Sequence, residues 1–261
     1  MVTGHDSYGK EIYAHHGENE YTRLAALAEE LDPATFRRLD ALGPAPDWRC
    51  LDIGTGLGTV AQWLAVRCPD GMVTATDLDL RFLHASPFGN LQFLQHDITA
   101  DEFPPGSFDV IHARWVFCHQ RSRVLDLAKV ARWLSPGGWL VIEDPAGFPL
   151  GSSTNSAFRR VSMALMAVVE ERFGTDHTWA REYPQPLREL GLSSISMDCL
   201  LPVVGGLRPM TQFWQKSIQQ LEPYITSYGL EPGDIDTVLD QITRGDFVDL
   251  GMASIAAWGQ R

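Results

Sequence analysis

Three glycines at alternate positions follow a short apolar run in the stretch CLDIGTGLGTV, residues 50–60. Glycine tolerates a positive φ and lets another molecule approach the backbone closely. The stretch joins an expected strand to an expected helix, whose N-terminus presents free N–H groups. Gly54, Thr55 and Gly56 are therefore the first candidates for contact with a cofactor. The spacing is G-x-G-x-G, and Thr59 stands where the dinucleotide fingerprint G-x-G-x-x-G has its last glycine.

Carboxylates follow the next two expected strands. Asp77 ends the strand in VTATDLD, where a carboxylate can accept hydrogen bonds from both hydroxyls of a ribose. Leu78 follows it and is expected to cover one face of a purine. In QHDIT, Asp97 is expected to accept from an adenine amino group, and the N–H of Ile98 to donate to a ring nitrogen. The alternative is that these aspartates only cap turns, and that the glycines only make a tight connection.

Apolar runs and helical patterns alternate through the middle of the chain. Strand patterns occur at residues 49–53, 72–76, 91–94, 108–113 and 139–142, and helical patterns include residues 59–67 and 124–134. This alternation predicts an α/β fold with a parallel sheet covered on both faces. Ahead of it, residues 20–31 predict one helix, and Asp32 and Pro33 predict the start of a second helix that ends at Gly43.

After Glu143 the alternation stops. Helical patterns cover residues 155–173, 178–190, 210–228 and 232–243, and strand patterns cover residues 193–200 and 247–258. Two of these helices carry large apolar side chains that either line a substrate pocket or pack in a core or an oligomer interface: Phe158, Met163, Met166, Phe213, Trp214 and Tyr224. The first alternative favours an aromatic or apolar substrate.

Five motifs follow one another in a fixed order: LDIGTGLG, VTATDLD, QHDIT, FDVIHARWVFCHQ and LSPGGWLVIEDP. Together they resemble the class I S-adenosylmethionine-dependent methyltransferases over about residues 49–144. Two further stretches, GENEYTRLAALAEELDP and HARWVFCH, are similar to the small-molecule group that includes ubiquinone, menaquinone and natural-product enzymes. The resemblance implies S-adenosyl-L-methionine as the cofactor. It also implies a doubly wound, mostly parallel seven-stranded Rossmann-like sheet with an N-terminal helical segment and a helical cap.

The resemblance implies a division of the chain as well. Residues 1–47 would form an N-terminal helical lid, residues 48–152, 175–208 and 244–261 the cofactor-binding core, and residues 153–174 and 209–243 a helical cap over the substrate pocket. By the same resemblance, Tyr21 or Arg23 would close over the cofactor. Arg114, just after the fourth strand, would lie near its methionine carboxylate.

Methyl transfer from a sulfonium depends above all on alignment of the reacting groups, so a general base is optional. His119 is the first candidate for a base, because it follows the fourth strand and an unperturbed histidine titrates near neutrality. Glu143 or Asp144 is the second, as a group that orients a substrate hydroxyl, amine or indole N–H. The alternative is that these residues cap local structure. His15 and His16 are expected to belong to a lid.

The composition excludes several classes of partner. The formal net charge is −12 and no run of Lys or Arg occurs, which argues against nucleic acid and anionic membranes as partners.

Four cysteines, at positions 50, 68, 118 and 199, lack metal-site spacing and are expected to be small core residues in a reducing compartment. No metal motif is found, and no apolar run is long enough to span a membrane. The sequence predicts a cytoplasmic protein.

The predicted function is an enzyme that methylates O, N or C of a small, aromatic or apolar metabolite, in secondary metabolism. One alternative uses the same fold and cofactor for cyclisation or decarboxylation. A nicotinamide-dependent oxidoreductase is disfavoured by the glycine spacing and by the absence of a Tyr-x-x-x-Lys pair. A macromolecular methyltransferase is disfavoured because HARWV, not an Asn-Pro-Pro-Tyr-like motif, follows the fourth strand. A non-catalytic subunit is disfavoured by the intact glycine turn, and a homodimer stays open.

Overall fold

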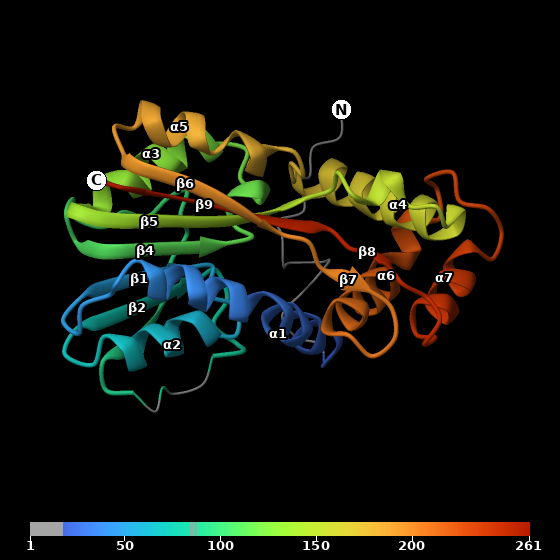
Figure 1. Ribbon diagram of the computed structural model, residues 1–261, viewed down its shortest axis with the longest axis horizontal. Coiled ribbons are helices and arrows are strands. Elements are labelled where there is room, and N and C mark those ends of the chain that lie inside the picture. The colour runs from blue at the N-terminus through green and yellow to red at the C-terminus, as the bar shows by residue number, and fades with distance from the viewer. Residues whose placement is uncertain (1–17, 84–85, 87) are drawn as a thin grey trace. The chain divides into compact units, whose positions relative to one another are not determined.

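The computed structural model describes residues 18–83, 86 and 88–261 (Figure 1). The first part of the chain contains α1 (Glu18–Ala41), β1 (Arg49–Ile53), α2 (Thr59–Arg67), β2 (Met72–Asp77), β3 (Leu91–Gln95), β4 (Phe108–Arg114), η1 (Phe117–His119), α3 (Arg123–Trp133) and β5 (Leu134–Ala146). The second part contains η2 (Leu150–Ser152), α4 (Ser156–Phe173), η3 (Trp179–Glu182), α5 (Pro184–Glu189), β6 (Ser193–Leu200), β7 (Val203–Val204), α6 (Pro209–Ile225), α7 (Asp234–Ile242), β8 (Asp249–Leu250) and β9 (Ala253–Gln260).

Seven strands form one sheet in the order β3-β2-β1-β4-β5-β9-β6. β1 runs parallel to β2 and β4, β2 parallel to β3, and β4 parallel to β5. Four of the five residues of β1 and five of the seven of β4 are buried, as expected for central strands covered on both faces. The predicted α/β fold with a seven-stranded, mostly parallel sheet is confirmed.

The first helix differs from the prediction of two helices. α1 continues through Pro33 without a break, although a proline inside a helix removes a backbone hydrogen bond. Leu31, Ala34 and Leu39 on both sides of the proline are buried. Their burial in the core outweighs the local preference of Pro33 for a helix start, since packing sets most helical stability in proteins.

Two later segments also depart from the prediction. Residues 178–190 divide into η3 and α5, because Pro184 has no N–H for a continuing helix and instead begins α5. Residues 247–258 divide into β8, which pairs with β7, and β9, which belongs to the large sheet. Gly251 lies between them and donates its N–H to the carbonyl of Pro202.

The chain forms two compact units. Unit 2 comprises residues 31–144, 179–199 and 255–261 and contains nearly all of the sheet. The described part of unit 1 comprises residues 18–30, 145–178 and 200–254, where α4 packs against α6 and α7. By contacts alone, residues 31–47 group with the sheet, and residues 145–152, 175–178, 200–208 and 244–254 group with unit 1. The predicted division by role into a lid, a cofactor-binding core and a cap stays a prediction.

Most of the large apolar side chains of α4 and α6 form the core of unit 1. Phe158 and Trp214 are fully buried with their ring centroids 5.7 Å apart, and Met166 and Phe213 are buried as well. Met163 is exposed. These positions therefore support core packing and give no argument for an aromatic substrate.

Three of the four cysteines are buried as predicted, but Cys199 is exposed because it lies on the edge strand β6. Of the helices that the structure describes, none has the length and apolar character needed to cross a membrane.

Candidate functional site

The turn between β1 and α2 lies at the carboxyl end of β1. Gly54 and Gly56 have φ values of 64° and 57°, in the left-handed region that strains other residues. The N–H of Thr55 donates to the carbonyl of Thr76 at 2.9 Å, which ties the turn to β2. A Cβ added to Gly54 would lie 2.4 Å from Cγ2 of Val116, whereas a Cβ added to Gly56 would have no atom of the described residues within 4 Å. The main chain at Gly56 is therefore accessible to a ligand.

Asp77 lies at the carboxyl end of β2, beside this turn. Its Oδ2 accepts a hydrogen bond from the N–H of Gly56 at 2.9 Å, and its Oδ1 accepts one from the N–H of Asp79 at 3.3 Å. Leu78, the next residue, is 48% exposed. A carboxylate, an accessible main chain and an exposed apolar side chain thus lie at one edge of the sheet, as the sequence predicted.

Asp97 follows β3 and closes the turn that comes after it. One of its carboxylate oxygens accepts from the N–H and from the hydroxyl of Thr99, at 2.8 and 2.7 Å. Burial raises the pKa of Asp97, but these bonds outweigh it and hold the pKa below its usual value. Ile98 is buried. The expected contacts of Asp97 and Ile98 with an adenine stay predictions.

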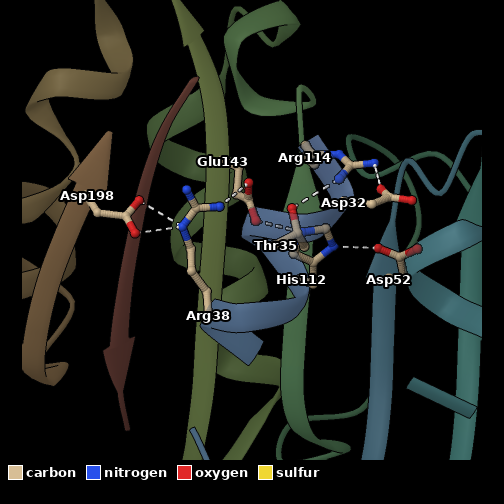
Figure 2. Close-up of polar contacts among 8 residues, drawn as sticks. All are labelled: Asp32, Thr35, Arg38, Asp52, His112, Arg114, Glu143 and Asp198. Atoms are coloured by element: carbon tan, nitrogen blue, oxygen red, sulfur yellow. Dashed lines mark hydrogen bonds and ion pairs between the residues drawn. The ribbon is translucent and has the colours of Figure 1, made fainter. Parts of the chain in front are cut away.

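A row of charged side chains of alternating sign crosses the sheet next to the glycine turn (Figure 2). This charge row consists of Asp52, His112, Glu143, Arg38 and Asp198. Asp52 of β1 and His112 of β4 are neighbours in the strand register. The Oδ1 atom of Asp52 lies 2.7 Å from Nδ1 of His112, and its Oδ2 accepts from the hydroxyl of Thr55 at 2.5 Å.

The charge row continues from His112 to the edge of the sheet. Nε2 of His112 lies 3.5 Å from Oε1 of Glu143 on β5. Arg38 of α1 donates from Nη1 to Oε2 of Glu143 at 2.9 Å, and from Nε to both carboxylate oxygens of Asp198 on β6, at 2.7 and 2.9 Å. The row therefore links the glycine turn to α1 and to the edge strand.

The partners in the charge row decide which groups carry charge. Both His112 and Glu143 are 1% exposed. Burial lowers the pKa of His112, but its bonds to Asp52 and Glu143 outweigh burial and raise that pKa above its ordinary value. Burial raises the pKa of Glu143, but His112 and then Arg38 outweigh it and lower that pKa to about 2. His112 thus favours the imidazolium form, and Glu143 is a carboxylate.

Arg114 stands at the end of β4 and contacts α1. Its Nη2 lies 2.8 Å from Oδ1 of Asp32, and its Nη1 donates to the hydroxyl of Thr35 at 3.0 Å. The Arg114 side chain is 13% exposed. These contacts join β4 to the second half of α1. A contact of Arg114 with a methionine carboxylate stays a prediction.

The two predicted catalytic residues have different surroundings. Glu143 is buried, and its two carboxylate oxygens face His112 and Arg38. These contacts favour a positioning role for Glu143 over direct contact with a substrate. His119 ends η1 after β4, is partly exposed, and donates its backbone N–H to the carbonyl of Val116 at 3.1 Å. Its catalytic role stays a prediction.

Asp144 is a second buried carboxyl at the end of β5. It is fully buried and accepts hydrogen bonds from the N–H of Cys118, at 2.9 Å, and from the hydroxyl of Tyr183. Burial raises its pKa to about 7, despite these bonds, which lower it. Asp144 therefore binds a proton in the folded protein at a pH where an ordinary aspartate does not.

This property predicts how stability changes with pH. The pKa of Asp144 is about 7 in the folded state and 3.8 ordinarily, so between these values the folded state binds more protons than the unfolded state. The free energy of unfolding should therefore fall as pH rises from about 4 to about 7, by roughly 4 kcal/mol in total from this group. Urea unfolding at successive pH values measures the free energy of unfolding. The Asp144→Asn variant should lack this fall with pH, and an identical pH dependence in the variant and the wild type would contradict the prediction.

Tyr21 and Arg23 lie on the part of α1 that belongs to unit 1. Tyr21 is 51% exposed. Arg23 is buried, donates to both carboxylate oxygens of Glu20 at 2.8 and 2.7 Å, and lies over the ring of Phe213 at 5.2 Å. The guanidinium of Arg23 is thus engaged within unit 1. Closure of Tyr21 or Arg23 over a cofactor stays a prediction.

Of the five members of the charge row, Glu143 alone was a predicted site residue. His112 carried a signal, since it is a polar residue inside the apolar strand FDVIHAR, and a buried polar group needs partners. Arg38 and Asp198 carried none, because they are 160 residues apart. His15 and His16 lie outside the described residues. In the part of the chain that the structure describes, no group of His, Cys, Asp or Glu is arranged to hold a metal ion.

Residues 51–142 match a family model described as a methyltransferase domain. The chain is 38% identical over 127 residues to the methyltransferase str3 of Strobilurus tenacellus, an alignment that covers 48% of this chain and 45% of that protein. It is 32% identical over 143 residues to the demethylmenaquinone methyltransferase of Thermus thermophilus, covering 51% of this chain and 64% of that protein. The chain spans about half the length of the first curated relatives that it matches.

A solved structure shares the fold. The YcgJ protein of Bacillus subtilis matches with a TM-score of 0.62 and 15% identity, over 88% of this chain and 98% of that one. At this identity the likeness concerns the fold alone.

Proposed function

We propose that residues 51–142, which match a methyltransferase domain, bind S-adenosylmethionine, and that the protein transfers a methyl group to O, N or C of a small metabolite. The residues of unit 2 fit this cofactor. The accessible main chain at Gly56, beside the carboxylate of Asp77, is the observation that carries the proposal.

Each group at this edge of the sheet has a part in binding. The glycine turn would receive the amino-acid portion of the cofactor, because its backbone can be approached closely there. Asp77 would accept hydrogen bonds from the two ribose hydroxyls, and the exposed side chain of Leu78 would cover the adenine. When bound, S-adenosylmethionine supplies a methyl group on a positively charged sulfur. The protein's main task is then to hold the acceptor in line with that group, which can provide roughly 7–11 kcal/mol.

The acceptor remains to be identified by experiment. The relatives named above include a demethylmenaquinone methyltransferase, which supports a small molecule as the acceptor. The expectation of an aromatic or apolar acceptor rested on side chains of α4 and α6 that mostly pack in the core of unit 1, and the expectation of a natural-product pathway rests on the sequence resemblance. We therefore place demethylmenaquinone first in the panel to be tested, because of the relative named for it, and include both aromatic and non-aromatic metabolites after it.

The test is incubation of the purified protein with methyl-labelled S-adenosylmethionine and this panel, followed by mass spectrometry. A product that gains one CH₂ and carries the label is expected. A product of unchanged mass formed only in the presence of the cofactor would instead indicate a cyclase. Calorimetry with S-adenosylhomocysteine is the independent measurement, and failure to bind either sulfur compound would contradict the proposal.

His119→Ala is expected to lower turnover about 100-fold, since general acid–base catalysis typically contributes 10²- to 10⁴-fold. The affinity for S-adenosylhomocysteine should change little. Steady-state kinetics with an identified acceptor, together with calorimetry, separates the two quantities. Full turnover in the variant would remove His119 from the mechanism and indicate that alignment alone drives the reaction.

A further inference from the structure

His112 is enclosed by acceptors on both sides of its ring. Asp52 faces Nδ1 at 2.7 Å, and Glu143 faces Nε2 at 3.5 Å. A neutral imidazole has only one N–H, so it would leave one of these buried carboxylates facing a lone pair. An imidazolium donates from Nδ1 to Asp52 and turns a second N–H toward Glu143, which lies at an ion-pair distance of 3.5 Å, too long for a full hydrogen bond. The geometry therefore suits a doubly protonated ring (Figure 2).

The neighbouring members of the charge row keep this arrangement in place. Arg38 from α1 holds the other oxygen of Glu143 at 2.9 Å, so Glu143 keeps a cation on each side. Arg114 on β4 adds a positive charge that further favours the Glu143 carboxylate. The charged groups that face His112 directly are Asp52 of β1 and Glu143 of β5. Both are acidic and both favour the imidazolium.

Asp52 passes this constraint to the turn. One of its oxygens contacts His112, and the other accepts from the hydroxyl of Thr55 at 2.5 Å. Thr55 stands between Gly54 and Gly56, which both have positive φ values. Because neither glycine has a side chain, the side chain of Thr55 is the one that can hold this part of the turn. A fixed Asp52 carboxylate therefore fixes the one side chain between these two glycines.

We propose that His112 is a positioning residue for the cofactor: as an imidazolium it holds the Asp52 carboxylate, which holds Thr55 and so sets the glycine turn that receives S-adenosylmethionine. This inference rests on the proposed function, because it concerns the same turn. His112 acts through Asp52 and touches neither the cofactor nor the acceptor.

The consequence for binding depends on pH. Below the pKa of His112, which its two carboxylates raise, the imidazolium is present and affinity is constant. As pH rises through that pKa, the ring loses the proton at Nε2 and its positive charge, whereas Nδ1 keeps a neutral hydrogen bond to Asp52. Affinity for S-adenosylhomocysteine should then fall, by up to about tenfold, as expected when a charge-assisted buried hydrogen bond becomes a neutral one.

The test combines three variants with a spectroscopic measurement on the wild type. His112→Gln should bind S-adenosylhomocysteine about tenfold more weakly at pH 7 and lack the fall at higher pH. Thr55→Val should weaken binding similarly, and Thr55→Ser should restore it. His177→Gln is the control, because His177 is a largely buried histidine of unit 1 outside the charge row. Nitrogen NMR of histidine-labelled wild-type protein should show both ring nitrogens of His112 protonated at pH 7.

Several results would overturn the inference while leaving the proposed function intact. They are a neutral His112 ring at pH 7, wild-type affinity in Thr55→Val, or wild-type affinity and pH profile in a folded His112→Gln protein. If His112→Gln does not fold, the Thr55 pair and the NMR measurement decide. A wild-type protein that binds no S-adenosylhomocysteine at any pH would instead contradict the proposed function.

Discussion

Asp77→Ala is expected to weaken binding of S-adenosylhomocysteine by about 100-fold or more, because two hydrogen bonds from ribose hydroxyls to a charged acceptor would be lost. Each such bond contributes about 1.5–3 kcal/mol, and about 1.4 kcal/mol corresponds to a factor of ten. The substitution also removes the acceptor of the Gly56 N–H, which reinforces the loss. Isothermal titration calorimetry measures the affinity.

Asp79→Ala is the matched control for this variant. Asp79 is a carboxylate two residues further along the chain, and its side chain pairs with Arg81. Its backbone N–H, which donates to Asp77, is kept in the variant. The control should bind S-adenosylhomocysteine nearly as the wild type does. Equal affinity in Asp77→Ala and the wild type would remove Asp77 from the ribose site.

Gly56→Ala is expected to lower the affinity for the cofactor by about 100-fold or more, equivalent to about 2.8 kcal/mol of binding free energy. The protein should still fold. The added methyl group meets no atom of residues 18–83, 86 or 88–261 within 4 Å. The free energy of unfolding should therefore fall only by the roughly 1–2 kcal/mol that an L-residue costs in the left-handed region. The same methyl group would stand where the proposed site brings the cofactor against the backbone. Calorimetry and thermal unfolding measure the two effects separately.

Gly106→Ala controls for the backbone strain in Gly56→Ala. Gly106 has a φ of 76°, and an added Cβ would likewise have no atom within 4 Å in the part of the chain that the structure describes. It lies in the turn before β4, at the amino end of that strand, away from the carboxyl edge that carries the site. The Gly106→Ala variant should lose about as much stability as Gly56→Ala and keep the wild-type affinity for S-adenosylhomocysteine. If both variants kept full affinity, the ligand would not contact the main chain at Gly56.

The sequence was sufficient to predict the first half of the sheet. β1 and α2 begin and end at the predicted residues, because an apolar strand and a helical pattern are separated by glycines that neither element accepts in its interior. Pro33 was misleading, since its local preference for a helix start was overruled by burial of the side chains around it. Such long-range packing is invisible to a local pattern.

The same distinction applies to the candidate site. Gly56, Asp77 and Leu78 could be placed because each lies at, or within three residues after, the end of a predictable strand. The pairing of Arg38 with Asp198 could not be predicted, since nothing in either local sequence indicates its partner. The sequence predicted a catalytic role for Glu143, and that role stays a prediction. Its burial between His112 and Arg38, which no local pattern indicates, favours a positioning role instead.

The hydrogen bond from Gly56 to Asp77 has a consequence for the thermodynamics of the proposed cofactor binding. The N–H of Gly56 already restrains the rotamer of the Asp77 carboxylate in the free protein. Binding of the cofactor there would therefore cost little side-chain conformational entropy. The ordering has already occurred during folding, and preorganisation of this kind strengthens affinity. Local fraying of the turn would release the carboxylate as well, so recognition should deteriorate on warming before the sheet melts.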